Sequence, residues 1–421
     1  MNKKVNSHPL RALVSWAFFD WANSAFSSVI QTFVFAAYFT RQVASNETTG
    51  TAEWGAAISI AGFLVAIGSP ILGAIADEAG HRKRWLAVFV IVCFLATASL
   101  WFIKPSPIYV LPAVILVAIG TIASEFTFVF YSSMLPSLAP RSQLGRWSGW
   151  GWGMGYAGGT LALTLSLVLF IYNGGLFFPD ADPSVHIRAC FVLVAIWLLV
   201  FSLPFFLFTP EAPIAYKSIG NAIRDGLKQL STTLTHIRQY AQIARFLIAY
   251  IFYIEGLTTL FAFGGVYAAN MFDMSNQDVM IFGIALNLIG GIGAAIFAFV
   301  DDKIGAKRTI LISLAGLIIT ASLALTAHST TLFWIFGLTM GLWVGPIQAS
   351  TRSFMARIAP AGMRTQMFGF LALSGKATAF MGPALVSWAT YASGDQRLGM
   401  SPIIVLLVIG GIAMLTVPRD D

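Results

Sequence analysis

Long apolar runs separated by short polar segments recur along the whole chain. A helix needs about 20 apolar residues to cross the hydrocarbon core of a bilayer. Runs of this length predict twelve transmembrane helices, at residues 12–40, 53–76, 85–104, 107–134, 146–172, 187–208, 246–269, 276–300, 307–327, 331–356, 365–390 and 400–417. The pattern therefore indicates an all-α, multi-pass membrane protein.

One longer polar segment divides these runs into two sets of six. It predicts an N-terminal bundle over 1–208, a linker over 209–245 and a C-terminal bundle over 246–421. Within the linker, Arg224, Lys228 and Arg238 recur among Ile, Leu and Ala residues. This spacing favours a helix that lies on the membrane surface. A solvated linker with partial helix fits the same residues equally well.

Composition indicates that the outer surface faces lipid rather than water. Of the 421 residues, 57% are hydrophobic and 10% are charged, and the mean hydropathy is +0.78. Soluble domains carry about 25% charged residues, so an ordinary soluble enzyme is excluded. The first apolar run contains Asp20 and lacks a small-residue cleavage site. We therefore interpret it as a transmembrane helix and not as a signal peptide.

The basic residues predict the orientation. With the N-terminus in the cytoplasm, 20 of the 25 Lys and Arg residues fall in cytoplasmic loops. The exceptions are Arg41, Lys104, Arg188 and Arg397 on the opposite side, and Lys376 inside the eleventh run. The positive-inside rule then predicts a cell (inner) membrane protein with both termini in the cytoplasm. The net charge of +7 is spread over short loops, so we expect no nucleic-acid partner.

A loop motif occurs once in each half, after the second and the eighth run. Its residues are Gly73, Asp77, Gly80 and Arg82 in the first copy, and Asp302, Gly305 and Arg308 in the second. Glycine permits close packing and tight turns, aspartate accepts hydrogen bonds at a helix end, and basic residues hold the loop in the cytoplasm. The pattern G-x-x-x-D-x-x-G-x-R-K resembles the signature of the major facilitator superfamily. Two parallel six-helix repeats explain the duplication.

Other stretches carry a narrower resemblance over almost the whole chain. They are the aromatic-Asp-Trp-Ala-Asn-Ser segment at 18–26, the glycine-rich segment at 147–159, and the segments 348–353, 375–376 and 382–383. They are similar to the autophagy-related vacuolar amino-acid effluxers and their bacterial relatives. The resemblance implies the facilitator fold and a secondary transporter that works by alternating access. It does not carry over a substrate.

Three acidic residues fall inside predicted membrane helices, namely Asp20, Glu125 and Glu255. Each lies roughly 14 Å from the cytoplasmic end of its helix, at 1.5 Å per residue. A charge at a helix centre costs roughly 2.5–3.5 kcal/mol unless it faces water or a partner. The family resemblance implies that helices one, four, seven and ten line the cavity. We therefore expect the three acids around a central site, as candidates for proton coupling.

Polar residues at helical spacing accompany these acids. The candidates for substrate binding are Asn23, Ser24, Ser27, Gln31, Thr121, Tyr156, Thr258, Thr259, Gln348 and Lys376. Such stripes suit a wet pathway for a small polar or zwitterionic solute, such as an amino acid. Lys376 could bind a substrate carboxylate, and Arg352 could bind one or serve as a cytoplasmic gate.

A purely structural role for the acids stays open, because they could pair with Lys376 and Arg352 to lock helices together. Three acids against two bases leave at least one without a partner, and such an acid is the best candidate for a proton carrier. The sequence favours Glu255 or Asp20 and does not separate them.

Other classes of function receive less support. Gly151, Gly155 and Gly159 form a small-residue face for helix packing, and the proline of the drug-exporter motif is missing before 156–159. No GxxxxGK[ST] motif occurs, and no histidine lies in the core of a predicted span, so we expect neither ATP as energy source nor a metal or other cofactor. We expect a monomer in the lipid bilayer that binds a small solute and protons. A carrier of amphipathic lipids or drugs and a non-transporting receptor remain alternatives.

Overall fold

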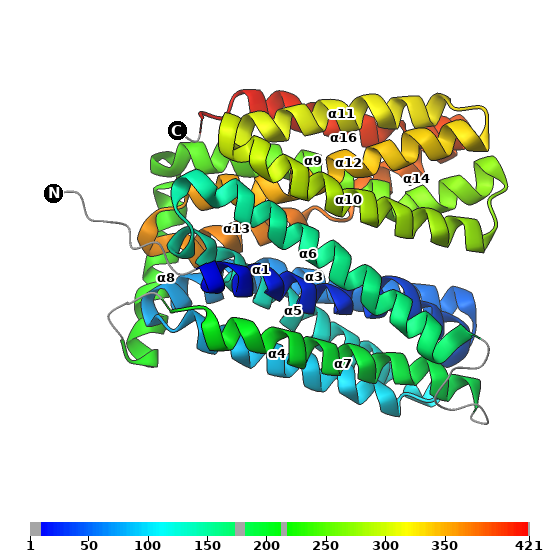
Figure 1. Cartoon of the computed structure of the whole chain (residues 1–421), viewed down its shortest axis with the longest axis horizontal. Helices are drawn as coiled ribbons and strands as arrows, with labels where there is room; N and C mark the ends of the chain where they lie inside the picture. Colours follow the sequence, from blue (N-terminus) through cyan, green and yellow to red (C-terminus); the bar gives the residue numbers. More distant parts are fainter. Residues whose placement is uncertain (1–9, 173–181, 212–216, 420–421) are drawn as a thin grey trace.

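The computed structural model describes residues 10–172, 182–211 and 217–419, which form two helical bundles side by side (Figure 1). The helices of the first bundle are α1 (Leu10–Ala25), α2 (Val34–Tyr38), α3 (Glu47–Ala79), α4 (Arg82–Ser99), α5 (Val110–Leu138), α6 (Leu144–Ser166) and α7 (Pro183–Phe208). The linker contains α8 (Ile219–Thr235). The second bundle has α9 (Ala241–Phe272), α10 (Asn276–Ile304), α11 (Ala306–Thr326), α12 (Thr330–Ile358), α13 (Arg364–Ala377), α14 (Met381–Ser393), α15 (Gln396–Gly399) and α16 (Ser401–Leu415).

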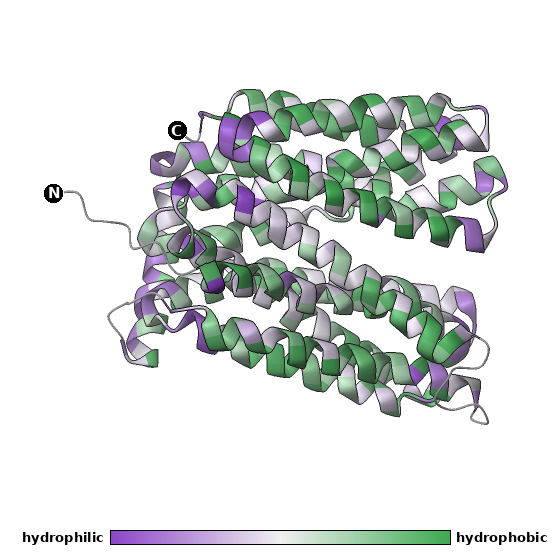
Figure 2. Cartoon of the chain, in the orientation of Figure 1, coloured by the Kyte–Doolittle hydropathy of each residue, from purple (hydrophilic) through white to green (hydrophobic). Residues whose placement is uncertain are grey.

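The predicted transmembrane architecture is confirmed. Within the described residues, eleven helical stretches are long and apolar enough to cross a membrane. The first predicted span is also helical, but two π-helical segments, Phe26–Phe33 and Phe39–Val43, interrupt it. Apolar residues cover the middle of the bundles and polar residues gather at their ends (Figure 2).

One predicted span needs correction. The run at 365–390 was expected as a single helix, but the chain leaves the helix between Ala377 and Met381. Pro383 lies two residues into α14. Its ring has no N–H to donate and clashes with the carbonyl four residues earlier, so a continuous helix is disfavoured at this point. The break separates α13 from α14 in the middle of the membrane-spanning stretch.

The bundles meet at one end of the molecule, here called the closed end, and diverge at the other, the open end (Figure 1). At the closed end α3 packs against α13, and α6 packs against α10. Glycines permit this approach, because a Cβ on Gly369 would lie 2.6 Å from the carbonyl carbon of Ser69. A Cβ on Gly149 would lie 2.5 Å from the carbonyl oxygen of Ala294. The two contacts are equivalent under the internal repeat.

Candidate functional site

A cavity of about 1100 Å³ lies between the bundles. Its polar wall includes Ser27, Gln31, Thr121, Glu125, Thr258, Gln348, Arg352 and Lys376. Its aromatic wall includes Trp54, Phe128, Trp152, Tyr250 and Phe380. Both bundles contribute to each wall, which is the arrangement expected for a site at the interface of two repeats.

Asp20 of α1 and Arg352 of α12 form a buried ion pair across the bundles. Oδ2 of Asp20 lies 2.8 Å from Nη1 of Arg352, and the two residues are only 5% and 2% exposed. The hydroxyl of Tyr131 donates to the same carboxylate oxygen at 3.1 Å. Arg352 also donates to Ser148, through Nε to the side-chain oxygen and through Nη2 to the carbonyl oxygen. The pair is thus held by hydrogen bonds on both sides.

Aromatic rings enclose this guanidinium. The Cζ atom of Arg352 lies 5.1 Å from the ring centre of Trp16, 5.3 Å from that of Tyr131 and 5.6 Å from that of Trp152. Such contacts add cation–π attraction where water is excluded. Gly151 completes the enclosure, since a Cβ there would lie 2.7 Å from Nη2 of Arg352. The glycine face of α6 therefore makes room for the ion pair as well as packing on α1.

Glu125 of α5 and Lys376 of α13 form a second ion pair across the bundles. Nζ of Lys376 lies 2.7 Å from Oε1 of Glu125. In contrast to the first pair, both side chains are partly exposed, Lys376 by 34% and Glu125 by 27%. Both line the cavity. A solute in the cavity can therefore reach a positive and a negative charge at adjacent positions.

Glu255 of α9 differs from the other two acids. Its side chain is fully buried, and no Lys, Arg or His in the described part of the chain forms an ion pair with it. Its two carboxylate oxygens accept hydrogen bonds from the hydroxyl of Thr378 at 2.9 Å and the amide of Gly382 at 3.2 Å. Thr378 lies in the break between α13 and α14, and Gly382 lies in the first turn of α14. Glu255 thus caps the first turn of α14 from a neighbouring helix.

The first loop motif closes the α3–α13 contact. Asp77 lies 2.8 Å from Nη2 of Arg82 and accepts hydrogen bonds from the backbone amides of Thr365 and Gln366. These amides belong to the first turn of α13. Gly80 has a φ of 70°, a left-handed conformation that favours glycine and lets the chain turn after α3. An aspartate of one bundle therefore caps a helix of the other.

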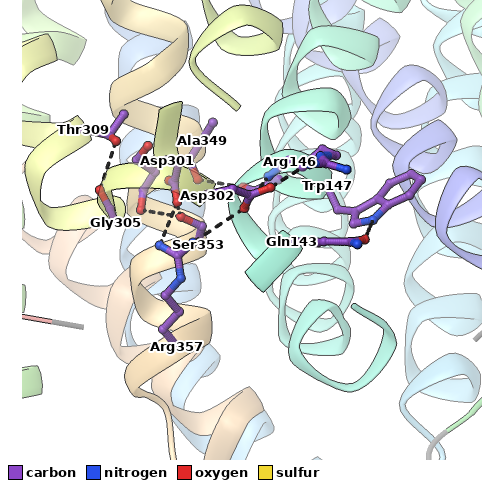
Figure 3. A network of polar contacts seen from close by, with 12 residues as sticks. Gln143, Arg146, Trp147, Asp301, Asp302, Gly305, Thr309, Ala349, Ser353 and Arg357 are labelled. Atoms are coloured by element: carbon purple, nitrogen blue, oxygen red, sulfur yellow. Dashed lines mark hydrogen bonds and ion pairs between the residues drawn. The ribbon is translucent and has the colours of Figure 1, made fainter. Parts of the chain in front are cut away.

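The second loop motif forms the equivalent contact between α10 and α6 (Figure 3). Asp302 accepts a hydrogen bond from the backbone amide of Arg146, in the first turn of α6, at 3.2 Å. Asp301 lies 2.7 Å from Nη1 of Arg357 and accepts the hydroxyl hydrogen bond of Ser353 at 2.6 Å. The two loops thus cap α13 and α6 at equivalent places, although the second loop divides the capping and the main arginine contact between Asp302 and Asp301.

A family model described as "Vacuole effluxer Atg22 like" matches residues 47–421. The chain belongs to this Atg22-like family. The Atg22-like chain is 28% identical over 409 residues to an uncharacterized MFS-type transporter, YxiO, of Bacillus subtilis (strain 168). The alignment covers 96% of this chain and 94% of the relative. It is 24% identical over 298 residues to autophagy-related protein 22-1 of Penicillium rubens, with 65% of this chain and 49% of the relative covered. The chain thus spans about half the length of that fungal relative.

Solved structures show that the Atg22-like chain has the major facilitator fold. The proton:xylose symporter XylE aligns with a TM-score of 0.73 at 16% identity, over 97% of this chain and 96% of that one. The transporter FucP in the outward conformation aligns with a TM-score of 0.72 at 13% identity, over 97% and 99%. The fold and the family together establish a multi-pass membrane transporter.

The structure distributes the predicted site residues of the Atg22-like chain over three settings. The residues in the cavity wall have been named above. Four others lie behind the wall, namely Asn23, Ser24, Tyr156 and Thr259. The side-chain oxygen of Asn23 accepts hydrogen bonds from Ser124 and Thr127, and the hydroxyl of Tyr156 donates one to Gln348 at 2.6 Å. Ser24 packs beside Gly155, and Thr259 packs against Gly382. Asp20 and Glu255 are also buried beside the cavity rather than in its wall.

Sequence reasoning missed the partners of the second loop motif. It counted Arg308, which is exposed, as the basic residue of the motif, whereas Arg357 and Arg146 contact Asp301 and Asp302. The repeat offset of 220 residues held a usable signal, because it relates Arg146 to Gln366, which lies in the matching first turn of α13. Asp302 therefore caps α6, which follows the fourth span, and Asp77 caps α13, which follows the tenth.

We expect Gly369→Ala to loosen the closed end, because its Cβ would meet the carbonyl carbon of Ser69 and the Cα of Pro70 within 2.8 Å. Ser133→Cys, at a buried position beside Thr365, reports the opening. Its reaction with a maleimide should become several-fold faster. Gly362→Ala is the matched control, because nothing lies within 4 Å of its Cβ position. Equal labelling rates in the two variants would contradict the role of the close contact.

Proposed function

We propose that this protein is a proton-coupled secondary transporter that moves a small zwitterionic solute, such as an amino acid, by alternating access. The observation that supports the proposal is the division of labour among three membrane-embedded acids. One is locked in a buried ion pair, one forms an ion pair in the cavity wall, and one has no cationic partner among the described residues.

The Glu125–Lys376 pair is the proposed substrate site. A zwitterion can replace the direct ion pair by two new ones, its carboxylate on Lys376 and its ammonium on Glu125. The exchange leaves no charge uncompensated, so it avoids the desolvation cost of a buried lone charge. The aromatic residues Phe128, Trp152 and Tyr250 in the same wall offer apolar surface to the rest of the solute.

Glu255 is the proposed proton carrier. A proton on this carboxyl removes its negative charge and places an O–H donor beside one of the two donors it now faces. Either the hydrogen bond from the Thr378 hydroxyl then reverses its direction, or the one from the Gly382 amide is lost. These bonds hold the joint between α13 and α14, and Lys376 lies in the last turn of α13. Proton binding at Glu255 is thereby connected to the position of the substrate-binding lysine.

The proposed orientation places the closed end in the cytoplasm, because the loops there carry most of the 25 basic residues. Both termini then lie in the cytoplasm of a cell that carries the protein in its inner membrane. The cavity in this conformation faces outward. We propose that the chain works as a monomer, since each bundle completes the other's half of the site.

The substrate class can be tested by thermal stabilisation of the purified protein. The test panel contains α-amino acids, the matched amines that lack the carboxylate and the matched acids that lack the amine. We expect stabilisation by an amino acid alone, and at least a tenfold weaker effect in Lys376→Gln, which removes the carboxylate partner. Lys104→Gln, an exposed residue outside the site, is the control. Equal stabilisation by an amine would contradict recognition of both charges.

A second cavity favours an alternative substrate class. It measures about 360 Å³, adjoins the first at Ser27 and has a mostly apolar wall that includes Phe33, Phe261, Phe282 and Phe333. An amphipathic solute could place its charged group at Lys376 and its apolar tail here. Stabilisation by long-chain lipids or aromatic drugs, and not by amino acids, would favour this alternative.

A further inference from the structure

The linker helix α8 runs across the ends of the membrane-spanning helices instead of along them (Figure 1). Gly226 packs on α3 so closely that a Cβ there would lie 2.8 Å from the Cα of Ile75. Ile75 belongs to the spanning stretch Glu47–Ala79 and lies about one helical turn before its end. The helix α8 therefore packs beside the last turn of α3, at the end of a membrane-spanning stretch.

Three faces run along α8. Ala222, Gly226 and Thr233 are buried against the protein. On the neighbouring face, Ile219, Ile223, Leu227 and Leu234 are exposed by 69%, 41%, 44% and 52%. At 100° per residue these four side chains fall within one quarter of the helix circumference. Arg224 and Lys228 follow on the third face, and both are exposed.

We propose that α8 binds anionic phospholipid in the leaflet at the closed end, with its apolar face among the acyl chains and Arg224 and Lys228 on the phosphates. The order of the three faces supports this partner, because a helix in the interface needs an apolar face toward the hydrocarbon and cations beside it. The one acid of α8, Asp225, is compensated within the protein. Its hydrogen bond from Lys217 holds its pKa below the ordinary value, and Lys217 also contacts Glu78 of α3. Arg224 lies 3.5 Å from the same carboxylate, and its side chain is 78% exposed and open to a phosphate.

Lipid bound at α8 bears on the closed end through hydrogen bonds to α13. Nε2 of Gln229 donates to Oε1 of Gln366 at 3.1 Å, and Nε2 of Gln366 donates to the hydroxyl of Thr233 at 3.0 Å. The backbone amide of Gln366 is the one capped by Asp77. Thus α8 contacts α3 of one bundle and α13 of the other, and its attachment to the leaflet strengthens the closure. This inference does not depend on the identity of the solute.

Nitroxide accessibility on the full-length protein tests the proposal. A label at Ile223→Cys reports the apolar face, and a label at Ser231→Cys reports the polar face of the same helix. Both native cysteines, Cys93 and Cys190, are buried. In vesicles of phosphatidylcholine with phosphatidylglycerol, we expect the ratio of oxygen to water-soluble nickel accessibility to be several-fold higher at 223 than at 231. Nickel accessibility at 223 equal to that at 231 would overturn the proposal.

The lipid charge is tested separately. Removing phosphatidylglycerol, or introducing Arg224→Gln with Lys228→Gln, should lower the ratio at 223, whereas Lys104→Gln should leave it unchanged. An equal ratio in phosphatidylcholine alone would overturn the anionic specificity. A further outcome is that neither oxygen nor nickel reaches the label at 223 and that dipolar broadening shows two labels close together. It would identify a second copy of the chain as the partner of α8 and would also overturn the proposal. If amino acids do not stabilise the protein but the accessibility ratio at 223 is as expected, the proposed solute is refuted and the lipid proposal stands.

Discussion

Glu255→Gln is expected to abolish accumulation of solute driven by a pH gradient and to leave exchange of solute across the membrane intact. Glutamine imitates the protonated carboxyl in two respects. It carries no charge, and its amide group places a donor against Thr378 or Gly382, as an O–H would. The variant is therefore fixed in one protonation state. A transport cycle that requires protonation and deprotonation of this residue therefore stops. Exchange continues, because it needs only solute binding and the reorientation of the solute-bound protein.

The measurement uses proteoliposomes with an imposed pH gradient, and counterflow of labelled solute reports exchange. The driving force at stake is large, since one charge moving through 100 mV is worth about 2.3 kcal/mol, or about fiftyfold in solute concentration. Glu47→Gln is the matched control, because this carboxyl is exposed and belongs to a solvent-accessible ion pair with Arg41. Full gradient-driven accumulation by Glu255→Gln would contradict the proton-carrying role of this residue.

Local sequence patterns were sufficient to predict the architecture, because the length of an apolar run and the charge of a loop are properties of short segments. The twelve crossings, the duplicated loop motif and the membrane-embedded acids all follow from such patterns. The pairing of those charges did not, since Asp20 and Arg352 are 332 residues apart, and Glu125 and Lys376 are 251 apart. Which acid meets which base depends on helix packing that no local pattern encodes.

The break between α13 and α14 shows the same limit from another side. The residues around it are apolar enough to continue a span, and Pro383 was the one local signal against a continuous helix. The amide that is lost from the helix ladder is taken up by Glu255 from a helix more than 100 residues away. The sequence placed Glu255 in the membrane but left its choice against Asp20 open. The geometry supports Glu255 as the proposed proton carrier, because Asp20 has a cationic partner in Arg352 whereas Glu255 caps a helix.

Removing one member of the Asp20–Arg352 pair is expected to produce the largest loss of stability in this protein. Asp20→Asn leaves a guanidinium that is 2% exposed without its counter-charge. Breaking a buried ion pair in this way costs about 3–5 kcal/mol. The midpoint of thermal unfolding in detergent should fall strongly in Asp20→Asn and in Arg352→Gln. The matched comparison is Glu125→Gln, whose partner Lys376 is 34% exposed, against 2% for Arg352, so the loss of stability should be far smaller.

The double variant Asp20→Asn/Arg352→Gln separates the energy of the pair from the cost of an unpaired charge. If the two residues act mainly on each other, the double variant should recover part of the stability that each single variant loses, because no net charge remains buried. Additive losses would show instead that each residue is held by its other neighbours, Tyr131 for the acid and Ser148 for the base. Since both of those neighbours belong to the first bundle, additivity would also mean that this ion pair does not hold the two bundles together. The closure would then rest on the capped helices α13 and α6 and on the other contacts between the bundles, such as the hydrogen bonds from Arg352 to Ser148.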